Sequence, residues 1–301
     1  MIRRRPVALA AVLSAGVLLA GCTGVAPEPA AAPEPQIEVD QALAALIPDD
    51  VREAGRLVVG TDPSYPPASS YGADGRTIVG FEPDLGAALG DLLGIEVEFR
   101  AEPFDELIDG LGSGTSDVVM SAMTDTAERE EHVDFVTYFQ AGTSIVVQRG
   151  NPFGIHDLAD LCGRSVAVED GTVQVELLTR SQEHCSGEGI TVQAEPSNDD
   201  ALIELRTGRV AAVLNDYPPA VHVTSTGPSQ AFFQLVSDVQ YEPGLYGIVV
   251  GRDRPELRDA LAAALTRLLD TGDYQRVMDR WDVSSGAVRA VTVNGTPVAA
   301  Q

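Results

Sequence analysis

The chain has 301 residues, with 20 basic side chains against 45 acidic ones and a formal net charge of −25 at pH 7. Such a charge repels phosphate backbones and excludes nucleic-acid binding as the main activity. Because 44% of the residues are hydrophobic, an acidic disordered chain is also excluded. The length suits two domains of roughly 100–150 residues. Every basic residue is arginine, so lysine Schiff-base chemistry is absent.

The amino terminus has the layout of an export signal. Three arginines at positions 3–5 precede an uncharged apolar run, Val7 to Ala20, that is too short to span a bilayer comfortably. The run leads into Gly21 and Cys22 and resembles the processing site of bacterial lipoproteins, where the chain is cut before a lipid-bearing cysteine. We therefore expect a signal peptide over 1–21 and a protein held by lipidated Cys22 on the outer face of the cytoplasmic membrane. The alternative is ordinary secretion, with Cys22 a bystander.

Residues 22–42 are rich in Pro, Ala and Glu, which predicts an extended tether ahead of a folded body that starts near Leu43. Outside the cytoplasm, Cys162 and Cys185 have an oxidant available, and we expect a disulfide in preference to two buried thiols. The chain-entropy model values the loop that it would close at ~3.4 kcal/mol. The four histidines are scattered without ligand spacing, so no metal site is expected.

The body alternates short β-rich runs with helical patterns, which predicts an α/β protein with largely parallel sheets. Strands are expected in a first unit at 57–59, 95–99, 118–120 and 133–136, with helices at 84–93 and around 107–111. Strands are expected in a second unit at 165–168, 191–194 and 210–214, with helices at 173–178 and 200–205. A helical stretch follows at 255–281, and Asn294-Gly295 is weak evidence for a hairpin near the end.

Two extended segments, 143–148 and 245–250, bracket the second unit and suggest two crossovers between lobes. The predicted organisation is a discontinuous first lobe over 43–142 and 245–290, and a second lobe with the crossover strands over 143–244. Residues 291–301 are expected to form a tail.

Four turns follow predicted strands at their carboxyl ends, where α/β sheets place their ligands. Asp62 and Tyr65 lie in a proline-rich turn, Arg129 follows a hydroxyl-rich turn at 121–126, the segment 169–174 contains Gly171, and Asp216 ends a strand. Hydroxyls, backbone N–H groups and a guanidinium together suit a carboxylate. Taken singly, the proline-rich turn could be local packing, Arg129 part of a solvated charged face, and Asp216 a helix cap.

These segments, in this order, resemble the family 3 extracellular solute-binding proteins, the polar amino-acid-binding proteins of ABC importers. The resemblance covers about 56–283. Its motifs are Asp62 with Tyr65-Pro66-Pro67, the run Gly80-Phe81-Glu82-Pro83-Asp84-Leu85, the turn 124–129, and Gly171-Thr172-Val173-Gln174. It implies a two-lobed type II periplasmic-binding-protein fold, in which two mostly parallel α/β lobes joined by two crossover strands close around one amino acid.

The resemblance also assigns roles to residues. Arg129 would hold the ligand α-carboxylate, assisted by Thr124 and by the backbone at Ser121 and Thr172, and Asp216 would hold the α-ammonium. The rings of Tyr65 and Phe104 would flank the ligand side chain, and Asp62 would reach its end. Ala122 and Val173 replace hydroxyl-bearing or smaller residues of many members but keep their backbone N–H groups.

We therefore expect a non-enzymatic, monomeric receptor without a cofactor that binds a polar or cationic L-amino acid and delivers it to an ABC permease. One alternative is a dehydratase of prephenate-type acids on the same fold. That activity needs a general acid in the cleft, for which Glu82 or Asp125 can only be nominated arbitrarily. A second alternative is a ligand sensor that acts on a partner protein.

Overall fold

The structure is a computed structural model that describes residues 36–298. The expected signal peptide, the expected lipidation site Cys22 and most of the expected tether lie outside the described residues. Within the described part, no helix combines the length and the apolar character needed to cross a membrane. The helix α1 (Gln41–Ala44) begins one residue before the predicted end of the tether at 42, and Ile37 already packs against the core.

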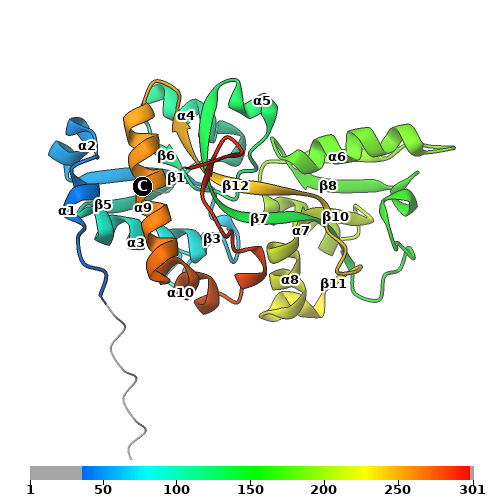
Figure 1. Cartoon of the computed structure of the whole chain (residues 1–301). Coiled ribbons are helices and arrows are strands. Elements are labelled where there is room, and N and C mark those ends of the chain that lie inside the picture. The colour runs from blue at the N-terminus through cyan, green and yellow to red at the C-terminus, as the bar shows by residue number, and fades with distance from the viewer. Residues whose placement is uncertain (1–35, 299–301) are drawn as a thin grey trace, which may run out of the picture. The chain divides into compact units, whose positions relative to one another are not determined.

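Strands and helices alternate along the chain, as predicted (Figure 1). The strands are β1 (Arg56–Thr61), β2 (Ser64–Tyr65), β3 (Ser69–Tyr71), β4 (Ile78–Val79), β5 (Glu96–Ala101), β6 (Val118–Val119), β7 (Val133–Gln148), β8 (Ser165–Glu169), β9 (Thr191–Glu195), β10 (Ala212–Asp216), β11 (Phe233–Leu235), β12 (Tyr241–Gly251), β13 (Thr292–Val293) and β14 (Thr296–Pro297). The α-helices after α1 are α2 (Asp49–Ala54), α3 (Phe81–Leu93), α4 (Leu107–Ser113), α5 (Ala127–Glu130), α6 (Val173–Ser181), α7 (Asn198–Arg206), α8 (Tyr217–Ser225), α9 (Pro255–Thr271) and α10 (Asp273–Arg280).

One continuous sheet runs through both lobes in the order β5-β1-β6-β12-β7-β10-β8-β9. Strands β5, β1 and β6 are parallel at one end, and β10, β8 and β9 are parallel at the other. The two long strands between them, β7 and β12, are antiparallel to each other and to the sheet neighbours β10 and β6. The fold is therefore α/β with two mostly parallel lobes, as predicted.

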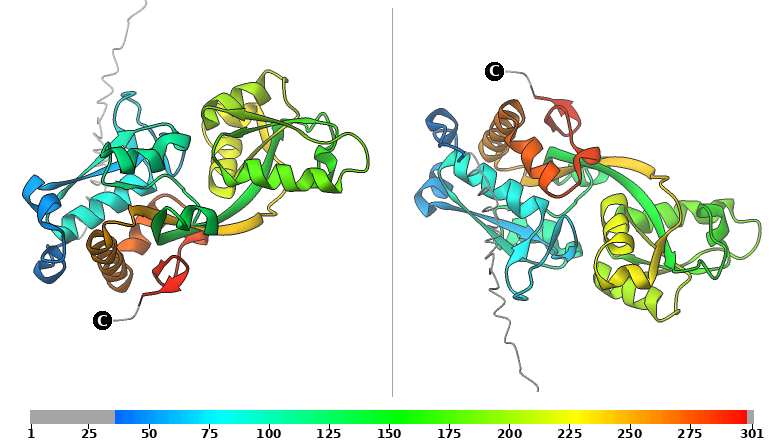
Figure 2. Two further views of the ribbon diagram at one scale, coloured as in Figure 1. Left: turned by 90° about the horizontal axis from the view of Figure 1, so that it is seen from above. Right: turned by 90° about the horizontal axis from the view of Figure 1, so that it is seen from below.

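Each lobe has its own buried apolar core. In the first lobe, α3 packs on β5, α9 packs on β7 and β12, and α10 contacts both helices (Figures 1 and 2). Phe81, Leu85 and Leu261 are fully buried there. In the second lobe, α6 and α7 pack on the sheet around β8, with Val166, Val168 and Leu205 buried. The exact lobe boundaries stay a prediction.

The crossover between the lobes differs in one respect from the prediction. Separate strands were expected at 133–136 and 143–148, whereas the structure forms the single strand β7. Strand β12 pairs Leu245 with Gln140 and Gly244 with Ala141, and after a register shift at Gly142 it pairs Tyr241 with Thr143. This pairing supplies hydrogen bonds that the local pattern does not indicate. The long strands β7 and β12 run side by side between the lobes (Figure 2).

Two further predictions can be checked near the carboxyl end. The helical stretch predicted over 255–281 divides into α9 and α10 at Gly272, which has a φ of 80° that ends α9 in the left-handed region. The hairpin at Asn294-Gly295 is confirmed as β13 and β14. Strand β13 pairs with β7, and Asn294 Oδ1 accepts from Phe135 N at 2.8 Å, so this tail is attached to the first-lobe end of the crossover strand.

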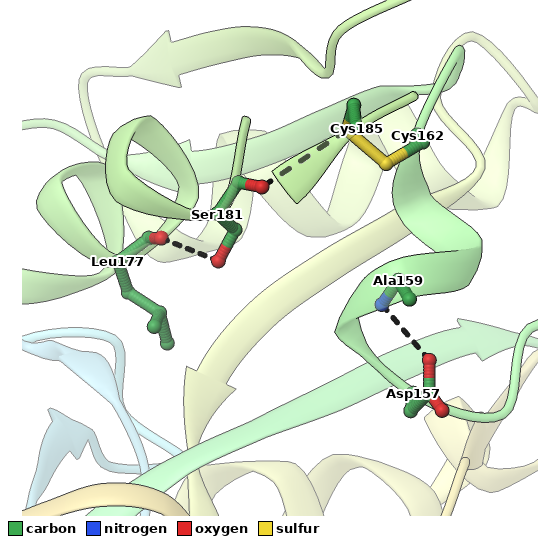
Figure 3. Close-up of a disulfide and its surroundings, with 6 residues drawn as sticks. All are labelled: Asp157, Ala159, Cys162, Leu177, Ser181 and Cys185. Atoms are coloured by element: carbon green, nitrogen blue, oxygen red, sulfur yellow. Dashed lines mark hydrogen bonds between the residues drawn. A yellow bond between two sulfur atoms is a disulfide. The ribbon is translucent and has the colours of Figure 1, made fainter. Parts of the chain in front are cut away.

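The disulfide between Cys162 and Cys185 is confirmed (Figure 3). The two cysteines end short 3-10 helices, Leu158–Leu161 and Gln182–His184, on either side of β8 and α6 in the chain. Asp157 begins the first of these by accepting from Ala159 N at 2.8 Å. The bond therefore joins the entrance of the second lobe to the end of α6.

Candidate functional site

A cavity lies between the lobes. Residues from both lobes line it, almost all of them at or just after the carboxyl ends of strands: Asp62, Tyr65, Phe104, Ser121, Ala122, Thr124, Arg129, Glu169, Thr172, Val173, Gln174 and Asp216. All ten ligand-binding residues expected from the sequence are in this set.

Arg129 is the only basic side chain that lines the cavity in the described part of the chain. Thr126 begins the short helix α5 by accepting from Arg129 N, and the guanidinium turns back to donate from Nη1 to Thr124 O at 2.7 Å. Nη2 donates to Gly171 O at 2.8 Å, and the group lies 5.7 Å from the centre of the Phe104 ring. Burial lowers the pKa of Arg129, and neighbouring acids oppose that shift. Its remaining N–H groups suit a carboxylate.

Asp216 lies at the end of β10 and is 5% exposed. Its Oδ1 accepts from Gln174 Nε2 at 2.7 Å, and its Oδ2 accepts from the Tyr246 hydroxyl at 2.6 Å. Burial raises the pKa of Asp216 to about 6, although these hydrogen bonds and the charge of Arg129 lower it. A second cation beside Asp216 would favour its ionised form.

Two more buried acids face the cavity. Asp62 is 7% exposed and its Oδ1 accepts from Ser64 N at 2.8 Å, while Glu169 is 6% exposed at the end of β8. Burial raises the pKa of Asp62, and burial followed by the charge of Asp62 raises that of Glu169 well above its usual range. Because the lining holds three acids and one arginine, the cavity favours ligands that carry positive charge.

Direct hydrogen bonds connect the lobes around the cavity. Asp216 N donates to the Tyr65 hydroxyl at 2.9 Å, and Asn198 Nδ2 donates to Ser64 O at 3.0 Å. Gly171 has a φ of 72°, and a side chain there would also approach Asp105 to 3.2 Å. Glycine therefore allows both the left-handed turn and the close contact between lobes. The structure shows the lobes closed on the cavity.

A buried acid outside the cavity supports the turn that follows β6. Glu82 is fully buried in α3, and its Oε1 accepts from Ala122 N at 2.6 Å and from the Tyr138 hydroxyl. Its Oε2 accepts from Ser69 Oγ at 2.7 Å. Ala122 has a φ of 47°, which a non-glycine residue rarely adopts, and the bond to Glu82 helps to hold it. Glu82 is thus a structural residue.

The model of the bacterial extracellular solute-binding proteins, family 3, matches residues 57–284. The chain belongs to this family. This chain is 30% identical to the arginine-binding protein ArgT of Corynebacterium glutamicum, over 88% of this chain and 86% of ArgT. It is 29% identical to the L-cystine-binding protein TcyJ of Escherichia coli over 77% of this chain and 84% of TcyJ.

Solved structures agree with this assignment. A mutant of the arginine-binding protein ArgBP from T. maritima superposes with a TM-score of 0.71 at 31% identity, over 78% of this chain and 98% of that one. An ancestral arginine-binding protein, solved with arginine, has a TM-score of 0.70 at 34% identity over 75% and 98% of the two chains. These neighbours have the type II periplasmic-binding-protein fold, as predicted.

An ancestral amino-acid-binding protein, AncCDT-1, described as a precursor of cyclohexadienyl dehydratase, has a TM-score of 0.69 at 30% identity. The match spans 79% of this chain and 99% of the AncCDT-1 chain.

Sequence reasoning selected the turn 169–174 but gave no ligand-binding role to three residues at the cavity. Glu169 and Gln174 line the cavity, and Tyr246 on β12 binds Asp216 from the crossover. Glu169 ends a strand, so the rule that selected Asp216 could have selected it as well. Among residues 36–298, no three His, Cys, Asp or Glu side chains are arranged to hold a metal ion.

Proposed function

We propose that this protein is a lipid-anchored, monomeric receptor outside the cytoplasm that binds an L-amino acid with a polar or cationic side chain and delivers it to an ABC permease. The observation that carries the proposal is that Arg129 and Asp216 line the same cavity and that the charge of Arg129 lowers the pKa of Asp216. A zwitterion needs a fixed cation for its carboxylate and a fixed anion for its ammonium, and burying either charge unpaired is costly.

The assignments follow from the chemistry of each group. The remaining N–H groups of Arg129 would bind the α-carboxylate, together with backbone N–H groups at Ser121 and Thr172, where α6 begins. Asp216, already oriented by Gln174 and Tyr246, would accept from the α-ammonium. The rings of Tyr65 and Phe104 would then flank the side chain, and Asp62 would bind its polar end.

Delivery to a permease follows from lobe closure. The hydrogen bonds from Asp216 to Tyr65 and from Asn198 to Ser64 form only when the lobes meet, so a ligand that draws them together changes the outer surface of the molecule. Relatives named as arginine-, cystine- and histidine-binding proteins support amino acids as the ligand class. Lipidation of Cys22 would keep the receptor beside its permease.

An enzymatic role as a dehydratase of prephenate-type acids is the second candidate. The likeness to AncCDT-1 and the raised pKa of Glu169, which would suit a general acid, favour it. The charge of the cavity argues against it, because three buried acids would repel a substrate with two carboxylates. We therefore place binding first and propose that the protein is not an enzyme.

A thermal-shift screen against the common L-amino acids and prephenate tests the proposal. A ligand at 100 times its dissociation constant should add about 2.7 kcal/mol to the free energy of unfolding. Arg129→Ala should weaken binding of every amino acid ligand by at least about 2 kcal/mol, because a buried carboxylate loses its charged partner. Arg164→Ala, which removes an arginine stacked on Phe153 away from the cavity, is the matched control. A stabilising response to prephenate alone, with its turnover, would instead support the enzyme.

A further inference from the structure

Two carboxylates from opposite lobes meet in the cavity. Asp62 directly follows β1 in the first lobe, and Glu169 ends β8 in the second. Both side chains line the cavity and are almost completely buried, and the charge of Asp62 raises the pKa of Glu169. Glu169 Oε1 has no hydrogen-bond partner in the described structure, although it is shielded from solvent. A buried carboxylate oxygen without a donor is costly, so the arrangement points to a donor that arrives with the ligand.

We infer that Asp62 and Glu169 together bind the cationic end of a guanidino amino acid, and that at neutral pH this cation is what lets the two lobes close. The inference rests on the proposed function and assigns the side-chain specificity of the same site. It adds Glu169 as a specificity-determining residue beside Asp62.

The charges around Asp62 and Glu169 favour a cation between these two carboxylates. Asp216 raises the pKa of Glu169 further. Asp199 at the start of α7 is exposed, and partial desolvation followed by the charge of Asp62 raises its pKa. Arg129 is the only cation in the described lining, and it is held by Thr124 O and Gly171 O. A guanidinium carries five N–H donors in a planar fork, enough to serve two carboxylates at once.

Closure without a cation requires a proton. When the lobes are apart, both acids face water and ionise independently. Closing them brings like charges together away from water, so Glu169 takes up a proton, in keeping with its raised pKa in the closed structure. Proton uptake by Glu169 therefore favours closure at low pH. This favourable free energy is lost as the pH rises through the pKa that Glu169 has in the closed structure. A guanidinium replaces the proton and closes the lobes at neutral pH.

Calorimetric titration with L-arginine and its neutral isostere L-citrulline tests the inference. At about pH 8 the unmodified protein should bind arginine at least about a hundredfold more tightly, because citrulline leaves the two carboxylates without a cation. Glu169→Gln should weaken arginine binding at least about tenfold without weakening citrulline binding. Glu188→Gln removes the same charge from an exposed position of the second lobe and should change neither affinity by more than about twofold.

A pH series on the unmodified protein gives a second test that needs no variant. Citrulline binding should take up a proton and arginine binding should not, so the arginine-to-citrulline affinity ratio should fall at least about tenfold from about pH 8 to about pH 5. Arginine and citrulline carry the same α-ammonium. Titration of Asp216 therefore changes both affinities equally and does not change their ratio.

The two proposals fail in different ways. If the unmodified protein binds no amino acid, the proposed function is wrong. If it binds amino acids but Glu169→Gln keeps the original ratio, or the ratio does not change with pH, only the inference about Asp62 and Glu169 is wrong. Should Glu169→Gln not fold, as judged by its melting transition, the pH series decides.

Discussion

Asp216 is the residue whose protonation should control affinity for every amino acid ligand. Its carboxylate is oriented in advance by Gln174 and Tyr246, and burial raises its pKa to about 6. Only the ionised form can accept from an α-ammonium at both oxygens without losing these donors. With the role proposed for Asp216, the ligand would therefore compete with a proton for its carboxylate.

We predict that arginine affinity falls as the pH is lowered through about 6, by at most about tenfold per pH unit, because binding must displace the proton on Asp216. Tyr246→Phe removes a hydrogen bond that lowers the pKa of Asp216, so it should move the midpoint of this loss to higher pH. Dissociation constants measured by calorimetry across the pH range give both midpoints. An unchanged midpoint in Tyr246→Phe would show that another group controls the loss.

At the scale of elements, sequence patterns selected most of the residues that line the cavity, because these residues follow strands. Asp62 follows β1, Ser121 follows β6, and Asp216 ends β10, so a local pattern and the rule for parallel sheets were enough to select them. The resemblance to a known family supplied their individual roles. Phe104, which reads as a core residue by itself, was selected only through that resemblance.

The remaining parts of the site depend on contacts between elements distant in the chain. Tyr246 lies in a crossover strand whose sequence shows only an extended segment, and it meets Asp216 through tertiary packing. Asp62 and Glu169 follow strands of different lobes and line one cavity only through the arrangement of the lobes. In the same way, β7 continues through 140–142 because β12 pairs with it there, which no periodicity within β7 indicates.

The disulfide should stabilise the second lobe without affecting the cavity. Cys162 and Cys185 are 23 positions apart, and neither lines the cavity. The double variant Cys162→Ala/Cys185→Ala should lower the free energy of unfolding by about 3 kcal/mol, because the unfolded chain regains the freedom that the closed loop removes. Urea denaturation measures this loss, and calorimetry should give an arginine affinity within about twofold of the original. Equal unfolding free energies would show that the bond adds no stability.

At the scale of the whole molecule, the charge of the surface and the charge of the cavity have the same sign. The chain carries −25, and loss of the proposed signal peptide would remove three arginines and no acid. Such a field attracts cationic ligands and repels anionic ones at low salt. It would therefore act at long range in the same direction as the contacts proposed for Asp62 and Glu169.

Lobe closure should be visible through Trp281, the only tryptophan of the chain. The first lobe holds its ring, since Nε1 donates to Asp84 Oδ2 at 2.9 Å. The ring also borders a groove whose other wall is formed by Tyr217, Val221 and His222 of α8 in the second lobe. Separation of the lobes would move this wall away and expose that side of the ring to water.

We predict that a saturating amino acid ligand shifts the fluorescence emission of Trp281 to shorter wavelength, because closure replaces water beside the ring with α8. Trp281→Phe should abolish the signal and leave the calorimetric affinity within about twofold, since Trp281 does not line the cavity. Arg129→Ala should give no shift at ligand concentrations that saturate the original protein. Binding detected by calorimetry without an emission change would mean that the ligand does not close the lobes at α8 and α10.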